Sequence, residues 1–161
     1  MKNKSAIKIV LLVVLALIVI TVILFIKSLY KKVYTVEEYT QLLNNYQYNV
    51  VDKTTDYSND STVKTYLQAK DKEGTYQIDF FIMNNEKSAS NYYKNIKKEL
   101  TREANGLKSN EKSSKTGFEK YTVEANGNYS VIIRSKNTII YSNAKSTKKE
   151  KINTLIRLLQ Y

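Results

Sequence analysis

The run from Ile9 to Ile26 holds eighteen consecutive residues without a charge, and only Thr21 among them has a polar side chain. As an α-helix at about 1.5 Å per residue, it would cover about 27 Å, close to the roughly 30 Å thickness of a bilayer core. A core helix in a small protein would show polar residues on its solvent side, whereas this run is apolar all round. We therefore expect a transmembrane helix over residues 9–27, with the lipid bilayer as the partner of Ile9 to Ile26.

The flanks of this run indicate a retained anchor. Cleavable signal peptides have apolar regions of about 7 to 15 residues that end in small residues, whereas this run continues as Lys27-Ser28-Leu29-Tyr30. The chain has no Cys to accept a lipid. Three lysines and the amino terminus precede the run, and three lysines follow it within residues 27–32. This slight excess favours a cytoplasmic N-terminus and an extracellular C-terminal domain, and a cytosol-facing interaction domain is the alternative.

These features divide the chain into four parts. We expect a short basic cytoplasmic tail (1–8), the transmembrane helix (9–27), a juxtamembrane segment (28–34) and one extracytoplasmic domain (35–161). Six of the 26 Lys and Arg flank the apolar run, which leaves 26 − 6 = 20 basic residues in the domain. The domain also holds all 15 acidic residues, so basic residues are in excess. This mild, interspersed excess suits a surface near anionic polymers of the envelope. It argues against nucleic-acid binding, which usually needs a clustered basic face.

The domain shows alternating helix and strand patterns. Capping-box motifs at Thr35 to Glu38 and at Thr147 to Glu150 predict the starts of two helices, and Asn126-Gly127 predicts a tight hairpin turn. The first expected helix runs from Val36 to about Asn45, the second begins at Asn84 or Asn85 and is closed by Asn105 and Gly106, and the third follows Thr147 and continues to Leu159. The expected strands are 48–52, 63–69, 76–83, 118–125, 128–135 and 138–143. The polar segment 107–116 is expected to be a loop. We predict an α+β fold with an antiparallel sheet of five or six strands and three helices, in the order α-β-β-β-α-β-β-β-α.

The last third of the chain, from Gly117 onward, carries the run IIRSKNTIIY and then a closing amphipathic helix. In these features it resembles the ends of small, uncharacterised, single-pass membrane-anchored extracytoplasmic proteins and lipoproteins of low-GC Gram-positive bacteria. The resemblance implies an extracytoplasmic α+β domain without an assigned activity.

Several function classes are excluded by composition. The chain has no His and no Cys, so Ser-His-Asp and Cys-His catalysis, thiol redox chemistry and the usual zinc sites are not available to it. The four glycines are each predicted at a turn or a helix end, and none belongs to a glycine-rich nucleotide-binding loop. We expect no cofactor and no metal, and we predict a membrane-anchored, non-catalytic binding or accessory module of the cell envelope.

A small hydrolase that uses carboxylates alone is the alternative. Asp79 with Glu124 could act on a glycan, and Asp52, Asp56 and Asp60 could hold Ca²⁺. Solvated surface acids explain both sets more simply.

Two candidate binding surfaces follow from the strand patterns. The strands around 78–83 and 131–140 are apolar on both faces, which is typical of central strands. One face would present Phe81, Met83, Ile132 and Ile140. We expect a helix to cover this face, and the alternative is an open surface for another membrane protein, with Phe81 and Ile132 as anchors. Arg134 with Asn137 is the candidate polar contact, although a strand Arg usually pairs across the sheet with an acid such as Glu124.

Overall fold

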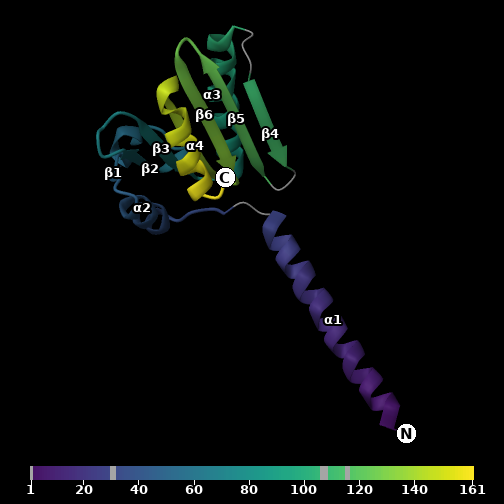
Figure 1. Ribbon diagram of the computed structural model, residues 1–161. Coiled ribbons are helices and arrows are strands. Elements are labelled where there is room, and N and C mark those ends of the chain that lie inside the picture. Colours follow the sequence, from purple (N-terminus) through teal and green to yellow (C-terminus); the bar gives the residue numbers. More distant parts are fainter. Residues whose placement is uncertain (1, 30–31, 106–108, 115–116) are drawn as a thin grey trace. The chain divides into compact units, whose positions relative to one another are not determined.

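The computed structural model describes the backbone of residues 2–29, 32–105, 109–114 and 117–161, and the side chains of residues 10–23, 32–105, 110–111 and 117–161. The chain divides into two compact units, Met1–Lys31 and Lys32–Tyr161. The first unit contains one helix, α1 (Lys2–Leu29), whose described side chains are exposed. The second unit contains the sheet and the helices that pack on it (Figure 1).

Seven antiparallel strands of the described chain form one sheet, in the order β1-β2-β3-β7-β6-β5-β4. Their bounds are β1 (Asn49–Asp52), β2 (Val63–Lys70), β3 (Gln77–Met83), β4 (Ser109–Ser114), β5 (Phe118–Ala125), β6 (Asn128–Ser135) and β7 (Thr138–Lys145). A first meander, β1 to β3, meets a second, β4 to β7, where β3 pairs with β7. The strands at this junction are buried on both faces, as their apolar sequences predict.

Helices cover both faces of the sheet. Helices α2 (Val36–Asn45) and α4 (Lys149–Leu158) pack on one face, and α3 (Glu86–Ala104) packs on the other (Figure 1). Because side chains alternate along a strand, each central strand contributes to two cores. Phe80 belongs to the core under α2 and α4, and Phe81 belongs to the core under α3. The expected helix-sheet-helix sandwich is confirmed.

The ends of α2 and α3 follow the sequence signals. The Thr35 side chain accepts a hydrogen bond from the Glu38 amide at 3.2 Å, and the Glu38 carboxylate accepts one from the Thr35 amide at 3.1 Å, which completes the predicted capping box. Helix α3 begins after Asn85, whose side chain accepts a hydrogen bond from the Ser88 amide, and ends at Asn105 in the left-handed conformation. The predicted caps thus fix both helices at their expected positions.

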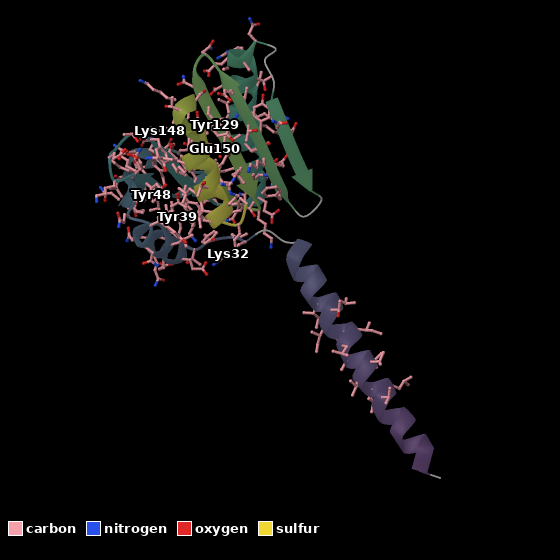
Figure 2. The ribbon with its side chains drawn as sticks, viewed as in Figure 1. Lys32, Tyr39, Tyr48, Tyr129, Lys148 and Glu150 are labelled. Carbon is pink, nitrogen blue, oxygen red and sulfur yellow. The ribbon has the colours of Figure 1, made fainter. Side chains whose placement is uncertain are left out.

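Tyr39 anchors α2 to the sheet. Its ring is fully buried and stacks on Phe80, with the ring centroids 4.2 Å apart and the planes 14° from parallel. Figure 2 labels Tyr39 of α2 and Tyr129 of β6, which belong to the same core, on the face of the sheet that α2 and α4 cover. The Tyr129 hydroxyl donates a hydrogen bond to Asn153 of α4 at 2.8 Å. One tyrosine on α2 and one on β6 therefore help to fix the two helices of this layer.

The strand count of the predicted fold is wrong. The described chain has seven strands, where we expected five or six. Its four α-helices are α1, in the region expected to span the membrane, and the three helices expected in the domain. The additional strand is β4, within the segment 107–116 that we expected to be a loop; residues 107, 108, 115 and 116 of that segment lie outside the described residues. Its sequence, SNEKSS, shows no apolar alternation because β4 is an edge strand that pairs through its backbone with β5 alone.

No helix in the described part of the chain is long and apolar enough to cross a membrane, which corrects the transmembrane helix expected over residues 9–27. The described side chains of α1 are those of residues 10–23, and they are exposed. The other side chains of residues 9–27 lie outside the described ones.

The predicted start of the closing helix is also wrong. A short 3-10 helix, η2 (Ser146–Lys148), precedes α4, and the N-cap residue is Lys148, which makes no side-chain capping hydrogen bond. The capping box expected from Thr147 to Glu150 does not form. Helix α4 is held by packing instead, because Ile152, Leu155 and Ile156 are buried against the sheet.

Candidate functional site

The apolar surface proposed from the sequence lies inside the protein. Phe81, Met83, Ile132 and Ile140 expose 2, 1, 0 and 1% of their surface. Three of them form part of the core beneath α3, together with Tyr93 of that helix. These residues therefore offer no open docking surface for a partner.

Ile140 also lies on the opposite face from the other three residues. In the pairing of β3 with β7, Phe81 lies opposite Ile139, and Phe80 lies opposite Ile140. Ile139 thus joins Phe81 and Ile132 in the core beneath α3, and Ile140 joins the core beneath α2 and α4. The assignment of Ile140 to the Phe81 face was wrong because it depended on a register that the strand sequences do not specify.

The proposed polar contact at Arg134 and Asn137 is used within the fold. Nε of Arg134 donates a hydrogen bond to Glu119, its cross-strand neighbour in β5, and Nη1 donates to the Lys136 carbonyl at 3.2 Å. Asn137 donates to the Met83 carbonyl at 3.1 Å. The acid expected opposite Arg134 was Glu124, but the register places Tyr129 opposite Glu124. Both side chains thus connect neighbouring strands.

The carboxylates proposed for a hydrolase are not brought together. Asp79 lies on the α3 face of β3, in register with Tyr141 of β7. Glu124 points to the other face, where Lys149 of α4 donates to it at 2.8 Å. Asp52, at the end of β1, accepts a hydrogen bond from Thr54, and the loop acid Asp60 accepts hydrogen bonds from Thr62.

Asp56 pairs with Lys53 at 3.7 Å. In the described part of the chain, no group of three or more Asp or Glu side chains could hold a metal ion. The geometry therefore supports neither the glycosidase pair nor the calcium site.

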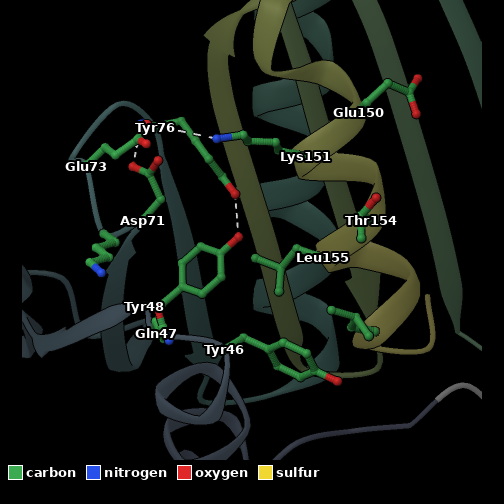
Figure 3. Close-up of a pocket in the computed structure, with 12 residues that line it drawn as sticks. Tyr46, Gln47, Tyr48, Asp71, Glu73, Tyr76, Glu150, Lys151, Thr154 and Leu155 are labelled. Carbon is green, nitrogen blue, oxygen red and sulfur yellow. Dashed lines mark hydrogen bonds and ion pairs between the residues drawn. The ribbon is translucent and has the colours of Figure 1, made fainter.

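A cleft of about 450 Å³ lies between three segments that are distant in sequence. The chain after α2 forms its floor, the β2–β3 turn forms one wall, and α4 forms the other (Figure 3). The lining residues are Tyr46, Gln47, Tyr48, Asp71, Lys72, Glu73, Tyr76, Glu150, Lys151, Thr154, Leu155 and Leu158. The volume is within the range of small-molecule and side-chain binding pockets.

Two tyrosine hydroxyls meet in this cleft. The hydroxyl of Tyr48 forms a hydrogen bond with that of Tyr76, and the two rings meet edge to face with centroids 6.1 Å apart. Burial raises the pKa of both phenols, so both are neutral at physiological pH. Figure 3 shows Leu155 of α4 facing the Tyr48 ring, so the cleft combines an aromatic wall, an aliphatic wall and a polar pair.

Asp71 fixes the wall formed by the β2–β3 turn. Its carboxylate accepts hydrogen bonds from the Thr75 amide at 2.6 Å, the Thr75 hydroxyl at 2.7 Å and the Tyr76 amide at 3.1 Å. Burial alone would raise the pKa of this carboxyl, but the bonds from Thr75 and Tyr76 lower it, so Asp71 stays ionised. Across the mouth of the cleft, Lys151 of α4 lies 3.9 Å from the Glu73 carboxylate.

The rim of the cleft is slightly acidic. Three carboxylates, those of Asp71, Glu73 and Glu150, line it with two ammonium groups, those of Lys72 and Lys151. The remaining lining is apolar or aromatic, and Tyr46 leaves 48% of its surface in solvent. This arrangement suits a ligand with an apolar group inside the cleft and a neutral or positive group at the rim.

Sequence reasoning missed this cleft. Its residues lie in three segments, 46–48, 71–76 and 150–158, and no local spacing connects them. Three tyrosines, Tyr46, Tyr48 and Tyr76, meet here from two of these segments. Only the tertiary pairing of β1 with β2 and the return of α4 over the sheet bring these segments together.

A comparison with protein-family models, with curated proteins and with solved structures finds no match to this chain. The resemblance of the last third to envelope proteins of low-GC Gram-positive bacteria therefore stays a prediction. We therefore infer a function from the geometry of the cleft.

Proposed function

We propose that the second unit, Lys32–Tyr161, is a non-catalytic binding module that holds a segment of a partner protein in the cleft between the β2–β3 turn and α4. The observation that carries this proposal is the exposed Tyr46 ring at the entrance of a cleft lined by Tyr48 and Leu155. Exposed aromatic residues next to an apolar cavity are typical anchors of protein recognition.

The charge of the rim supports a protein partner more than an anionic polymer. Three carboxylates against two ammonium groups would repel a chain of phosphates or carboxylates. An apolar side chain flanked by Lys or Arg fits both the walls and the rim. Another membrane protein was one of the two partners expected from the sequence, and the cleft favours it over the anionic envelope polymer.

A peptide library tests this proposal. Random peptides displayed on phage are selected on the purified full chain, and we expect enriched peptides with a large apolar residue beside a basic one. Tyr46→Ala should weaken their binding by about tenfold or more, because truncating an interface hot spot costs about 2 kcal/mol or more. Val51→Ala is the matched control, since Val51 is 42% exposed on β1 and does not line the cleft.

Two results would contradict the proposal. Selected peptides that bind Tyr46→Ala as tightly as the unchanged protein would place their site elsewhere. Enrichment of acidic peptides without apolar residues would indicate the anionic-polymer alternative.

The cellular setting stays a prediction. An extracellular domain should be cut by protease added to intact cells whose outer wall has been removed, and a cytosolic domain should be protected. The predicted contact of Ile9 to Ile26 with a lipid bilayer is tested by fractionating cell membranes. If the contact exists, the full chain should stay in the membrane fraction in high salt and should leave that fraction only when detergent is added.

A further inference from the structure

Asp79 is the one charged side chain among the described residues that is buried, with 8% of its surface exposed. It lies near the middle of the sheet, between Gln68 of β2 and Tyr141 of β7, on the face that α3 partly covers. This is the opposite face from the cleft, where Tyr76 and Leu155 belong to the other core. A site at Asp79 is therefore independent of the proposed peptide site.

The hydrogen bonds of Asp79 come from neutral groups. The Tyr66 hydroxyl donates at 2.9 Å, and the Gln77 amide lies 3.4 and 3.5 Å from the two carboxylate oxygens. Gln68 in turn donates to the Tyr66 hydroxyl at 3.1 Å. Within the described chain no Lys or Arg forms an ion pair with Asp79. The carboxylate thus lies in a low-dielectric site without an ion-pair partner among the described residues.

Other nearby groups are aromatic or negative. The ring of Tyr66 stacks on Phe81 at 4.5 Å between centroids, and Tyr57 meets both rings edge to face at 5.1 and 5.5 Å. Tyr92 of α3 approaches Phe81 at 5.2 Å. Rings of this kind attract cations through their π faces.

The charges that act on Tyr141, the neighbour of Asp79 in β7, are also negative. Burial raises the pKa of the Tyr141 hydroxyl, and the negative charges of Glu103, Asp79 and Glu99 raise it further. Lys70 is the one cation that acts on Asp79, and it is exposed at the end of β2. Gln68, Gln77 and Tyr141 are each half-buried, so solvent reaches the edge of this group. A positive ligand at this edge would therefore meet the Asp79 carboxylate and the Tyr141 hydroxyl, on which negative charges already act.

We propose that Asp79 and the tyrosines around it form a binding site for a small organic cation with a primary ammonium group. The ammonium hydrogens would bond to Asp79, and the alkyl part would lie against the half-buried ring of Tyr92. A bare divalent metal fits less well, because Ca²⁺ takes six to eight oxygen ligands and the described residues provide no cluster of three acids.

The test uses the purified full chain and n-butylammonium chloride as the probe. Amide resonances of Gln68, Asp79 and Tyr141 are followed by NMR during the titration, with n-butanol as a neutral probe of equal length and sodium chloride as the ionic-strength control. We expect saturable shifts with n-butylammonium alone. Asp79→Asn should weaken binding by about tenfold or more, since it removes the charge-assisted hydrogen bond to the ammonium group.

Glu37→Gln is the matched control, because it removes the same charge from an exposed position of α2 on the other face of the sheet. It should leave the affinity unchanged. A second measurement is calorimetry in two buffers of different ionisation enthalpy. Burial raises the pKa of Asp79, so binding to the ionised carboxylate should weaken as the pH falls, and it should release protons at a pH near or below that raised pKa.

Any one of four results would overturn the proposal. The first three are equal shifts with n-butanol, equal affinity of Asp79→Asn and the unchanged protein, and no saturable shift with n-butylammonium. A loss of affinity in Glu37→Gln as large as in Asp79→Asn would indicate a general charge effect and would also overturn it.

Discussion

The buried hydroxyl of Tyr39 gives the sharpest test of the packing described above. The ring is fully buried on Phe80, and its hydroxyl has no hydrogen-bond partner among the described residues. Burying a hydroxyl without a partner costs about 1 to 3 kcal/mol, while the ring keeps its contacts when the oxygen is removed. Tyr39→Phe should therefore raise the free energy of unfolding by about 1 to 2 kcal/mol.

Tyr129→Phe is the matched comparison. Its hydroxyl donates to Asn153 at 2.8 Å and so connects β6 to α4. The same chemical change should here lower the free energy of unfolding by about 0.5 to 1.5 kcal/mol, because a satisfied hydrogen bond is lost. The two substitutions remove the same atom from the same face of the sheet and should act in opposite directions.

Urea unfolding of the full chain, followed by tyrosine fluorescence and circular dichroism, measures both effects. With a slope of about 2 kcal/mol per molar urea, Tyr39→Phe should raise the midpoint by about 0.5 to 1 M. A lower midpoint for Tyr39→Phe would refute the reasoning, because the hydroxyl would then have a stabilising partner. An equal fall of the unfolding free energy in both variants would also refute it, because the two hydroxyls would then contribute alike whether or not a hydrogen-bond partner is seen.

Two further predictions concern a helix cap and pH. Thr35→Ala should destabilise the domain by about 1 kcal/mol, because it breaks the capping box with Glu38. Thr147→Ala should change stability by less than about 0.5 kcal/mol, because α4 has no side-chain capping hydrogen bond. Chemical denaturation of the two variants checks both values. Burial raises the pKa of Asp79 above its ordinary 3.8, so its contribution to stability is complete below pH 3.8 and is lost as the pH rises through the folded-state pKa. Asp79→Asn should thus stabilise the fold at pH 7 more than at pH 3, and an equal effect at both values would contradict this.

Most of the local structure could be predicted from the sequence because its signals are local. The Thr35 capping box fixed α2, and Asn126-Gly127, with both residues at positive φ, made the hairpin between β5 and β6. The apolar sequence of β3 correctly indicated a strand covered on both faces. Each of these signals depends on residues that are close together in the chain.

The errors arose where the structure depends on contacts between residues that are distant in the sequence. Strand β4 has a polar sequence and owes its conformation to β5, so its own residues did not predict it. Ile140 and Glu124 were placed wrongly because strand register depends on tertiary pairing. The cleft at Tyr48 and Tyr76 could not be found from sequence, since its walls meet only after α4 returns over the sheet. Asp79 was visible as an acid within an apolar strand, but its tyrosine neighbours were not.

The junction of β3 with β7 has a consequence for synthesis of the chain. Phe80 and Ile140, which lie opposite each other there, are far apart in sequence, so the sheet can close only after β7 has been made. Until then β3, with the sequence QIDFFIM, has one partner strand, and its other edge is unpaired. Such an apolar edge is a template for pairing with other chains. A ribosome-bound chain that stops before β7 should therefore aggregate more readily than the complete protein.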